Sequence, residues 1–236
     1  MTIVYVLDVS GAQPKIDSAA WGKVKTSGIV AIWAKATDGV GSPDGNFMSH
    51  ALGARAAGIL VGAYHYLRVR NGEQDAVKQA DEFCDRYLQA HCELPPMVDV
   101  ESNGQPSVLS DNWRIAIKQF LARVKERLGK WCIIYTSKGE WESFGLSSAT
   151  EFASSPLWLA NTSGTMTPSV PSPWKVPMLF QYTWQGHVEG IPVNIDVSVF
   201  NGSLTKLRTW AGKWPLASIA AGITGAILLY AVWRKR

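Results

Sequence analysis

The residues from Leu60 to Glu101 carry the pattern that decides the fold: LVGAYHYL (60–67), then EQDAVKQADEFCDRYLQ (73–89), then MVDVE (97–101). The first and last runs are short and nearly continuously apolar, which is typical of parallel strands that are covered on both faces. The middle run is amphipathic and long enough to be the crossover helix that two parallel strands require. This stretch therefore predicts a strand, a helix and a second parallel strand.

The same alternation extends in both directions from this unit. Further strand-like runs cover residues 3–9, 29–37 and 131–136. A second amphipathic segment runs from Ser110 to Leu128, with Ser110 and Asp111 as its expected N-terminal cap and Gly129 as its stop. The first 145 residues or so thus resolve into repeated β/α units.

The alternation of strand-like and helix-like segments ends after Thr150. Three more strand-like runs follow, at residues 157–160, 178–184 and 193–200. The prolines between the first two exclude a regular helix, and the gap 185–192 is too short for a parallel crossover of about a dozen residues. The sequence therefore predicts an α/β fold, a TIM-like barrel with five β/α units followed by three strands that lack helices.

The C-terminal end of the chain has the pattern of a membrane anchor. No residue from Leu216 to Trp233 is charged, and about 18 such residues are near the minimum for a helix that crosses a bilayer. Tryptophans flank this run and three basic residues follow it. We expect a barrel domain at 1–202, a juxtamembrane linker at 203–215, a single-pass transmembrane helix at 216–233 and a basic tail at 234–236; a buried core helix is the alternative for the apolar run.

This expected helix also suggests partners. It would place the chain in a lipid bilayer, and its small residues Ala217, Ala221 and Gly225 are spaced to allow weak self-association of two such helices. Basic residues stand on both sides of the apolar run, so the positive-inside rule gives no orientation.

The composition limits the classes of protein and of function that fit this chain. The chain has 236 residues, 47% hydrophobic and 18% charged, which fits one large globular core and excludes a disordered or repetitive chain. A net charge of +4 and scattered basic residues give no reason to expect nucleic-acid binding. Cys84, Cys92 and Cys132 cannot all pair within one chain and match no zinc pattern, so we expect free, buried thiols.

Carboxylates mark several of the predicted strand ends, where the active site of a β/α barrel forms. Asp8 closes the first run, Asp99 and Glu101 close the fourth, and Asp196 falls in the eighth. Asp99 and Glu101 are two residues apart, so on a strand they share one face with Cα atoms about 6.6 Å apart. A glycosidic bond is cleaved by a proton donor together with a negative charge near the transition state. Glu101, with a pKa raised by its neighbours and by burial, suits the donor.

Aromatic and hydrogen-bonding residues occupy the other predicted strand ends. Aromatic faces pack against the apolar faces of sugar rings while their polar tips form hydrogen bonds. Any one of these residues could instead fill the core, but as a set they indicate a carbohydrate-binding cleft: Tyr64, His65, Tyr66, Tyr135, Trp158, Gln181, Tyr182 and Trp184.

Seven short motifs accompany the predicted strands: LDVS (7–10), AKATDG (34–39), GAYHY (62–66), PMVDVE (96–101), LWLA (157–160), QYT (181–183) and NIDVS (194–198). In their order and spacing, over residues 3–202, they resemble the strand motifs of glycoside hydrolase family 25. That family consists of lysozymes that cut the β-1,4 bond from N-acetylmuramic acid to N-acetylglucosamine. Its barrel has five β/α units and three further strands, so the resemblance implies the same architecture.

The resemblance also implies roles for individual residues. Glu101 would be the acid/base. Asp99 would be a nucleophile, or would orient the substrate N-acetyl group for neighbouring-group attack. Asp8 and Asp196 would set the position and electrostatics of that pair. The expected sugar-binding residues are Tyr64, Tyr135, Trp158, Gln181 and Lys35. One departure is Asp38, where the family often has Glu.

The resemblance implies peptidoglycan glycan strands as the substrate, no cofactor and no metal. Because the expected membrane helix stands where many wall lysozymes have a separate wall-binding repeat, we expect the setting to be cell-wall lysis of the phage endolysin type, or remodelling of the wall beside its membrane, with the barrel on the cell-wall side. Two alternatives remain at this stage. A chitinase-like hydrolase also uses an Asp-x-Glu strand end, and an inactive sugar-binding barrel could be displayed on a membrane.

Overall fold

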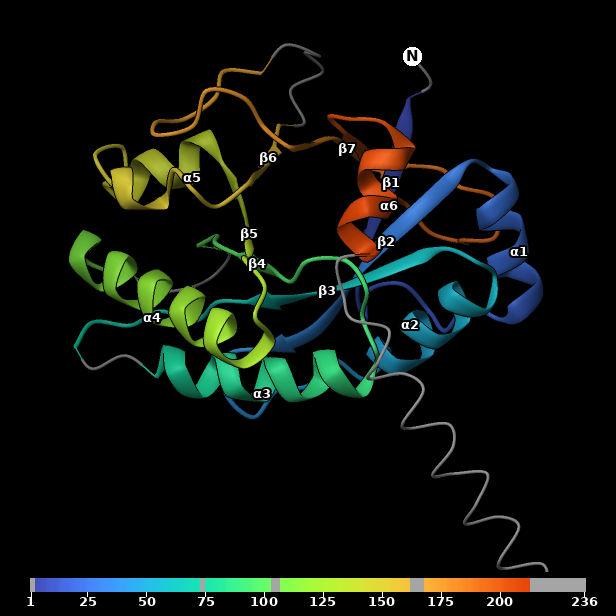
Figure 1. Ribbon diagram of the computed structural model, residues 1–236, viewed down its shortest axis with the longest axis horizontal. Helices are drawn as coiled ribbons and strands as arrows, with labels where there is room; N and C mark the ends of the chain where they lie inside the picture. Colours follow the sequence, from blue (N-terminus) through green and yellow to red (C-terminus); the bar gives the residue numbers. More distant parts are fainter. Residues whose placement is uncertain (1–2, 73–74, 103–106, 162–167, 213–236) are drawn as a thin grey trace, which may run out of the picture.

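Eight strands close into a barrel in chain order, and Figure 1 shows the ribbon of the whole chain. The structure, a computed structural model, describes residues 3–72, 75–102, 107–161 and 168–212. The strands are β1 Val4–Val9, β2 Ile29–Asp38, β3 Leu60–Tyr66, β4 Met97–Asp99, β5 Ile133–Ser137, β6 Leu157–Ala160, β7 Leu179–Gly186 and β8 Ile195–Phe200.

Helices follow the first five strands and lie outside the barrel (Figure 1). They are α1 Ser18–Thr26, α2 Phe47–Ala56, α3 Ala76–Gln89, α4 Ser110–Leu128 and α5 Lys138–Ser143, with a 3₁₀ turn η1 at Thr150–Phe152 and a last helix α6 at Leu204–Gly212. Among the described residues no helix joins β6 to β7 or β7 to β8. The predicted architecture of five β/α units and three further strands is confirmed.

The last strand runs against both of its neighbours. Strands β1 to β7 pair in parallel, whereas β8 is antiparallel to β7 and to β1. The start of β8 therefore lies at the end of the barrel where the other strands finish. This reversal makes Asp196, the second residue of β8, the register partner of Asp8 near the end of β1.

Two tryptophans fill the interior of the barrel. Trp33 of β2 and Trp158 of β6 are fully buried and pack edge to face, with ring centroids 5.0 Å apart. Trp33 Nε1 donates to the carbonyl of Pro95 at 2.8 Å, and Trp158 Nε1 donates to Ser198 Oγ at 3.0 Å. Because Ser198 lies two residues beyond Asp196 on β8, the Trp158 contact lies one layer below that carboxylate.

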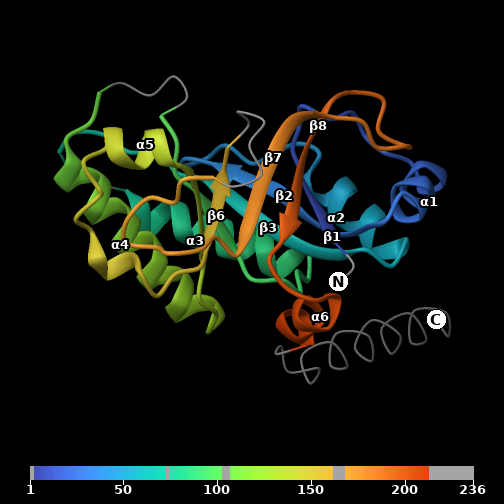
Figure 2. The ribbon, with the colours of Figure 1, turned by 90° about the horizontal axis from the view of Figure 1, so that it is seen from above.

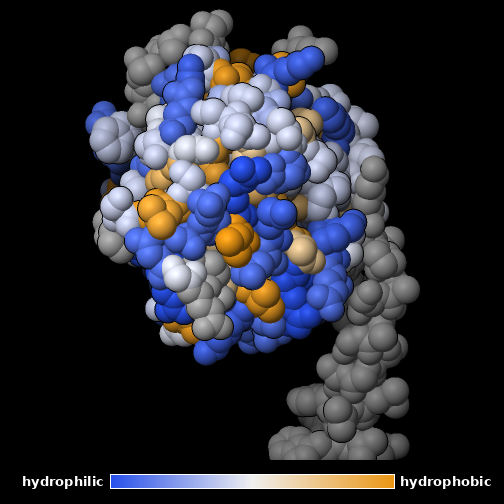
Figure 3. All heavy atoms as spheres, turned by 90° about the vertical axis from the view of Figure 1, so that its left-hand side faces the viewer, coloured by the Kyte–Doolittle hydropathy of each residue, from blue (hydrophilic) through white to orange (hydrophobic). Residues whose placement is uncertain are grey.

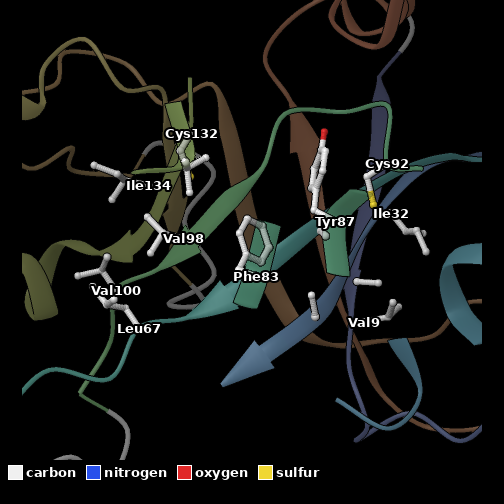
Figure 4. Close-up of a cluster of buried hydrophobic side chains, with 14 of the residues drawn as sticks. Val9, Ile32, Leu67, Phe83, Tyr87, Cys92, Val98, Val100, Cys132 and Ile134 are labelled. Carbon is white, nitrogen blue, oxygen red and sulfur yellow. The ribbon is translucent and has the colours of Figure 1, made fainter. Parts of the chain in front are cut away.

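A second core lies between the barrel and the helices. Phe83 of α3 lies beside Val98 of the barrel, and Tyr87 of α3 lies beside Cys92 (Figure 4). The three cysteines are free and buried, as expected from their number and spacing. On the side of the molecule where α4 and α5 lie, the surface is mainly hydrophilic, with apolar residues in small separate spots (Figure 3).

Helix α4 begins at the predicted residue but not with the predicted cap. Its N-cap is Leu109, and no side chain caps it. The expectation that Ser110 and Asp111 form the cap was wrong, because both residues already lie inside the first turn. The predicted stop is confirmed: Gly129 has φ 65°, and its N–H donates to the carbonyl of Lys125.

Helix α6 lies in the stretch that we expected to be a linker. It packs at the end of the barrel where β8 finishes (Figure 2), with Leu207 fully buried and Trp210 in edge contact with Phe200 and Trp131. The expected transmembrane helix at 216–233 lies outside the described residues. Of the helices that the structure describes, none is long and apolar enough to span a bilayer.

The packing of Trp33 predicts that Gly62 cannot carry a side chain. A Cβ at Gly62 would lie 2.5 Å from Trp33 Nε1, which is tied to Pro95. We expect Gly62→Ala to lower the free energy of unfolding by about 1–3 kcal/mol, the usual cost of overpacking. Urea unfolding followed by tryptophan fluorescence measures the effect.

The matched control is Gly22→Ala in α1, where an added Cβ meets no atom within 4 Å. This change should leave stability unchanged or raise it by up to about 1 kcal/mol, because alanine favours a helix. Equal unfolding midpoints for Gly62→Ala and the unsubstituted protein would show that Trp33 is free to move.

Candidate active site

The strand ends surround a pocket of about 220 Å³ at the mouth of the barrel. A larger cleft of about 790 Å³ adjoins it, and both are lined by Glu101, Tyr135 and Asp196. Within the described parts of the chain, no group of three or more His, Cys, Asp or Glu residues could hold a metal ion. The smaller pocket brings together all four carboxylates singled out in the sequence with Lys35, Tyr64 and Tyr135: Asp8, Asp99, Glu101 and Asp196.

Asp8 and Asp196 form a hydrogen-bonded carboxyl pair across the β1–β8 ladder. Burial, the charge of Asp196 and this hydrogen bond raise the pKa of Asp8 well above its ordinary value. Burial also raises the pKa of Asp196, but the hydrogen bonds from Asp8 and Gln181 oppose that rise. Of the two, Asp8 is therefore the partner whose protonated form is favoured more strongly, because the charge of Asp196 adds to the effect of burial.

A chain of hydrogen bonds orients this pair from the other side of the barrel. Tyr135 Oη donates to Gln181 Oε1 at 2.6 Å, and Gln181 Nε2 donates to Asp196 Oδ1 at 2.9 Å. Tyr135 and Gln181 are both buried, and burial raises the pKa of the Tyr135 hydroxyl, which stays protonated. Three residues from β5, β7 and β8 are thereby fixed relative to one another.

Asp99 lines the smaller pocket and is buried. The residue is 8% exposed, and its Oδ1 is buried and accepts no hydrogen bond from any residue that the structure describes. Burial raises its pKa well above the ordinary value, Glu101 raises it further, and Lys35 opposes the rise. A buried oxygen without a donor is costly in a purely structural carboxylate, and it is available to a ligand that brings a donor.

Glu101 follows β4, which ends at Asp99, and reaches the same pocket. Burial, followed by the charges of Glu140 and Asp196, raises its pKa to about 7, with Lys35 acting in the opposite direction. Its main-chain carbonyl accepts a hydrogen bond from Tyr66 Oη at 3.0 Å. With a pKa close to neutral, Glu101 can both give and take a proton under ordinary conditions.

Glu140 is a residue of the site that was not predicted from the sequence. It lies in the first turn of α5, where its N–H donates to Ser137 Oγ at 3.1 Å and its carboxylate accepts from Ser102 Oγ at 2.8 Å. The Ser-x-x-Glu pattern at 137–140 is a recognisable start of a helix. Only the fold shows that this carboxylate turns toward the residue after Glu101.

Several expected cleft residues lie elsewhere. Trp158 is fully buried in the barrel interior and cannot contact a sugar, so its expected place among the sugar-binding residues is corrected. His65 points away from the mouth and contacts Thr37 and Gln79. Trp184, by contrast, lines the larger cleft and is 63% exposed.

Known proteins share the fold and part of the sequence of this chain. A family model described as glycosyl hydrolases family 25 matches residues 7–191. Lysozyme M1 of Streptomyces globisporus is 32% identical, over 88% of this chain and 71% of its own. An N,O-diacetylmuramidase of Arthroderma benhamiae is 30% identical, over 86% of this chain and 85% of its own. A solved bacterial lysozyme from Streptomyces coelicolor, 31% identical, superimposes with a TM-score of 0.79 over 89% of this chain and 98% of its own.

The position of Glu140 predicts a shift in the titration of Glu101. Glu140→Gln removes a negative charge that helps raise the pKa of Glu101 to about 7, so that pKa should fall by roughly half a unit to one unit. The ¹³C NMR titration of glutamate-labelled protein, assigned with Glu101→Gln, measures it. Glu142→Gln on the same helix, whose carboxylate faces Lys138, is the control and should leave the midpoint unchanged. An unchanged midpoint in Glu140→Gln would remove Glu140 from the site.

Proposed function

Because this chain belongs to glycosyl hydrolases family 25, we propose that it is a muramidase that hydrolyses the β-1,4 bond from N-acetylmuramic acid to N-acetylglucosamine in peptidoglycan. The observation that carries the proposal is Glu101, with its pKa raised to about 7, in one pocket with Asp99. Relatives named lysozyme and N,O-diacetylmuramidase support a wall substrate over chitin.

Glu101 is the general acid. At neutral pH a substantial fraction of its carboxyl is protonated, and it can donate to the glycosidic oxygen as the bond to the leaving sugar breaks. Once that sugar has left, the same carboxylate can take a proton from the incoming water. The carbonyl contact with Tyr66 holds the backbone of Glu101 in place for both steps.

Asp99 supplies negative charge at the reacting carbon. It acts either as a nucleophile or by orienting the substrate N-acetyl group, and both mechanisms require its charge as the transition state develops. The repulsion between Asp99 and Glu101 favours one proton on the pair, and the proposed mechanism requires that proton on Glu101 when the substrate binds. A proton on Asp8, whose pKa burial and the charge of Asp196 raise, lowers the negative charge on their side of the mouth.

The larger cleft is the place for the glycan strand. Its lining combines hydrogen-bonding groups of Gln181, Asn161 and Ser137 with the exposed indole of Trp184. An exposed aromatic face beside polar groups suits a sugar ring, which has one apolar face and polar edges. Tyr135 lies between this cleft and the carboxylate pocket and contacts both.

Glu101→Gln tests the acid directly. The amide keeps the shape of the side chain but cannot deliver a proton, so release of reducing ends from purified peptidoglycan should fall about a hundredfold to ten-thousandfold. Circular dichroism should show an unchanged fold. Near-normal turnover by this variant would assign the acid to another residue, and turnover of chitin oligomers alone by the unsubstituted enzyme would favour the chitinase alternative.

Asp99→Asn tests the second carboxylate. The change removes the charge and keeps the volume, so kcat on peptidoglycan should fall by more than about tenfold, while the reaction remains dependent on Glu101. A loss smaller than this would place Asp99 outside the reacting groups. Product analysis by mass spectrometry identifies the bond that is cut in either case.

We further propose that the enzyme works in cell-wall lysis beside a membrane, as a phage endolysin would, with residues 216–233 as a single-pass anchor. The support comes from the sequence, in which that run has no charge and ends in three basic residues. The carboxylates of the site all precede Phe200. The anchor would therefore hold the enzyme at the membrane and would not be needed to cleave the bond.

The anchor predicts a membrane-bound protein. The full-length chain should sediment with membranes and resist extraction by salt or alkali, because each buried methylene contributes about 0.8 kcal/mol. A chain that ends at Lys213 should digest wall fragments at an unchanged rate but lyse cells less well. Recovery of the full-length chain without detergent would refute the anchor.

A further inference from the structure

Three charged residues at the rim of the carboxylate pocket form a cluster that the roles above leave unexplained. In this rim cluster, Asp38 accepts from Lys35 Nζ at 2.9 Å, and from Arg68 Nε at 2.6 Å and Nη2 at 3.2 Å. Lys35 lines the pocket itself. The cluster therefore runs as one chain of ion pairs from the pocket outward, and Asp38 is its central member.

An irregularity in β2 brings Lys35 and Asp38 together. Residues three apart on a regular strand point to opposite faces, so these two side chains would not meet. The register between β2 and β3 shifts between Lys35 and Thr37, where one extra residue is accommodated. This bulge returns Lys35 and Asp38 to the same side, a use of bulges that is common next to active sites.

The buried side-chain amide of Gln79 fixes the main chain of Arg68. Gln79 of α3 accepts the main-chain N–H of Arg68 at 3.0 Å and donates to its main-chain carbonyl at 2.7 Å. Gln79 Oε1 also lies 2.8 Å from His65 Nε2. Burial lowers the pKa of His65 to about 4, so His65 is neutral and donates this hydrogen bond. The guanidinium of Arg68 thus extends from a fixed backbone.

Tyr66 links the rim cluster to the acid. Both cations lie close to its ring, with Lys35 Nζ 5.0 Å and Arg68 Cζ 4.4 Å from the ring centroid. Its hydroxyl donates to the main-chain carbonyl of Glu101. The position of Lys35 and the position of Glu101 therefore depend on the same aromatic ring.

We propose that Asp38, held by Arg68, is a positioning residue that fixes the ammonium group of Lys35 at the rim of the carboxylate pocket. Held there, Lys35 faces the carboxylates while Asp38 balances part of its charge. Without Asp38 the ammonium group is free to pair with Asp99 or Glu101, and a close cation favours the ionised carboxylate. The proposal rests on the catalytic role proposed above for Glu101.

Many charged groups surround the mouth of the barrel. The test must therefore separate the change in the pKa of Glu101 that depends on Lys35 from the effects of the other groups. The groups that face it are Asp8 from β1, Lys35 and Asp38 from β2, Tyr64 from β3, Arg68 after β3, Asp99 and Glu101 at the end of β4, Tyr135 from β5, Glu140 from α5 and Asp196 from β8. A double-mutant cycle separates one pair from such a background.

The experiment compares Asp38→Asn, Lys35→Met and the double variant in the full chain. For each, the ¹³C NMR titration of Glu101 and the pH dependence of kcat/KM on peptidoglycan are measured. Asp38→Asn should lower the midpoint of Glu101 and of the alkaline limb by roughly half a unit to one unit. In the Lys35→Met background the same change should have less than about half this effect, because no ammonium group is released.

Two further variants test the charge of Asp38. Asp38→Glu should keep the midpoint near its normal value, since it retains the carboxylate. Arg68→Met removes a cation and leaves Asp38 in place, so it should move the midpoint in the opposite direction, to higher pH. The matched control is Glu151→Gln, which breaks the comparable ion pair with Arg114 far from the mouth and should shift nothing.

An equal shift from Asp38→Asn with and without Lys35 would overturn the proposal in favour of a direct field effect. A loss of rate with no change of midpoint in both Asp38→Asn and Arg68→Met would overturn it in favour of a structural role. The NMR titration does not require turnover. An unsubstituted enzyme that fails to digest peptidoglycan would therefore contradict the proposed function and still leave the role of Asp38 measurable.

Discussion

The site depends on the partial burial of its carboxylates, and two tryptophans inside the barrel provide the apolar surface beneath them. Trp33 and Trp158 fill the space between the strands, and each indole N–H donates to a protein oxygen, so both rings are held in place. Carboxylates that lie above these two rings lose water contacts on one side, and this loss of hydration raises the pKa of a carboxylate. Burial is accordingly the first cause of the raised pKa of all four carboxylates at the mouth: Asp8, Asp99, Glu101 and Asp196.

The site divides its negative charge between two pairs with different environments. Asp8 and Asp196 face each other directly; burial raises the pKa of both, and the charge of Asp196 raises that of Asp8 further. Asp99 and Glu101 come from one strand end and have Lys35 nearby, which partly offsets the effect of burial. Asp8 and Asp196 therefore interact mainly with each other, whereas Asp99 and Glu101 can exchange a proton with a substrate.

Several of the contacts that hold the reacting groups come from neighbouring elements. Tyr66 at the end of β3 holds the carbonyl of Glu101, and Glu140 on α5 holds Ser102, the next residue. Sequence inspection did not find Glu140, because its pattern indicates only a helix start. It also misplaced Trp158, because the alternation of a strand tells which residues point inward but not how deep they lie.

The sequence by itself determined the barrel, the order of its strands and the strand ends that carry Asp99 and Glu101, because apolar periodicity and the position of a carboxylate after a strand are local properties of the chain. The short gap at 185–192 excluded a parallel crossover into β8, but only the tertiary structure decided that β8 also pairs with β1, in a register that places Asp196 opposite Asp8. It also decided the bulge that turns Asp38 toward Lys35. Strand direction and register arise from pairing between distant segments, and no pattern within either segment records the partner.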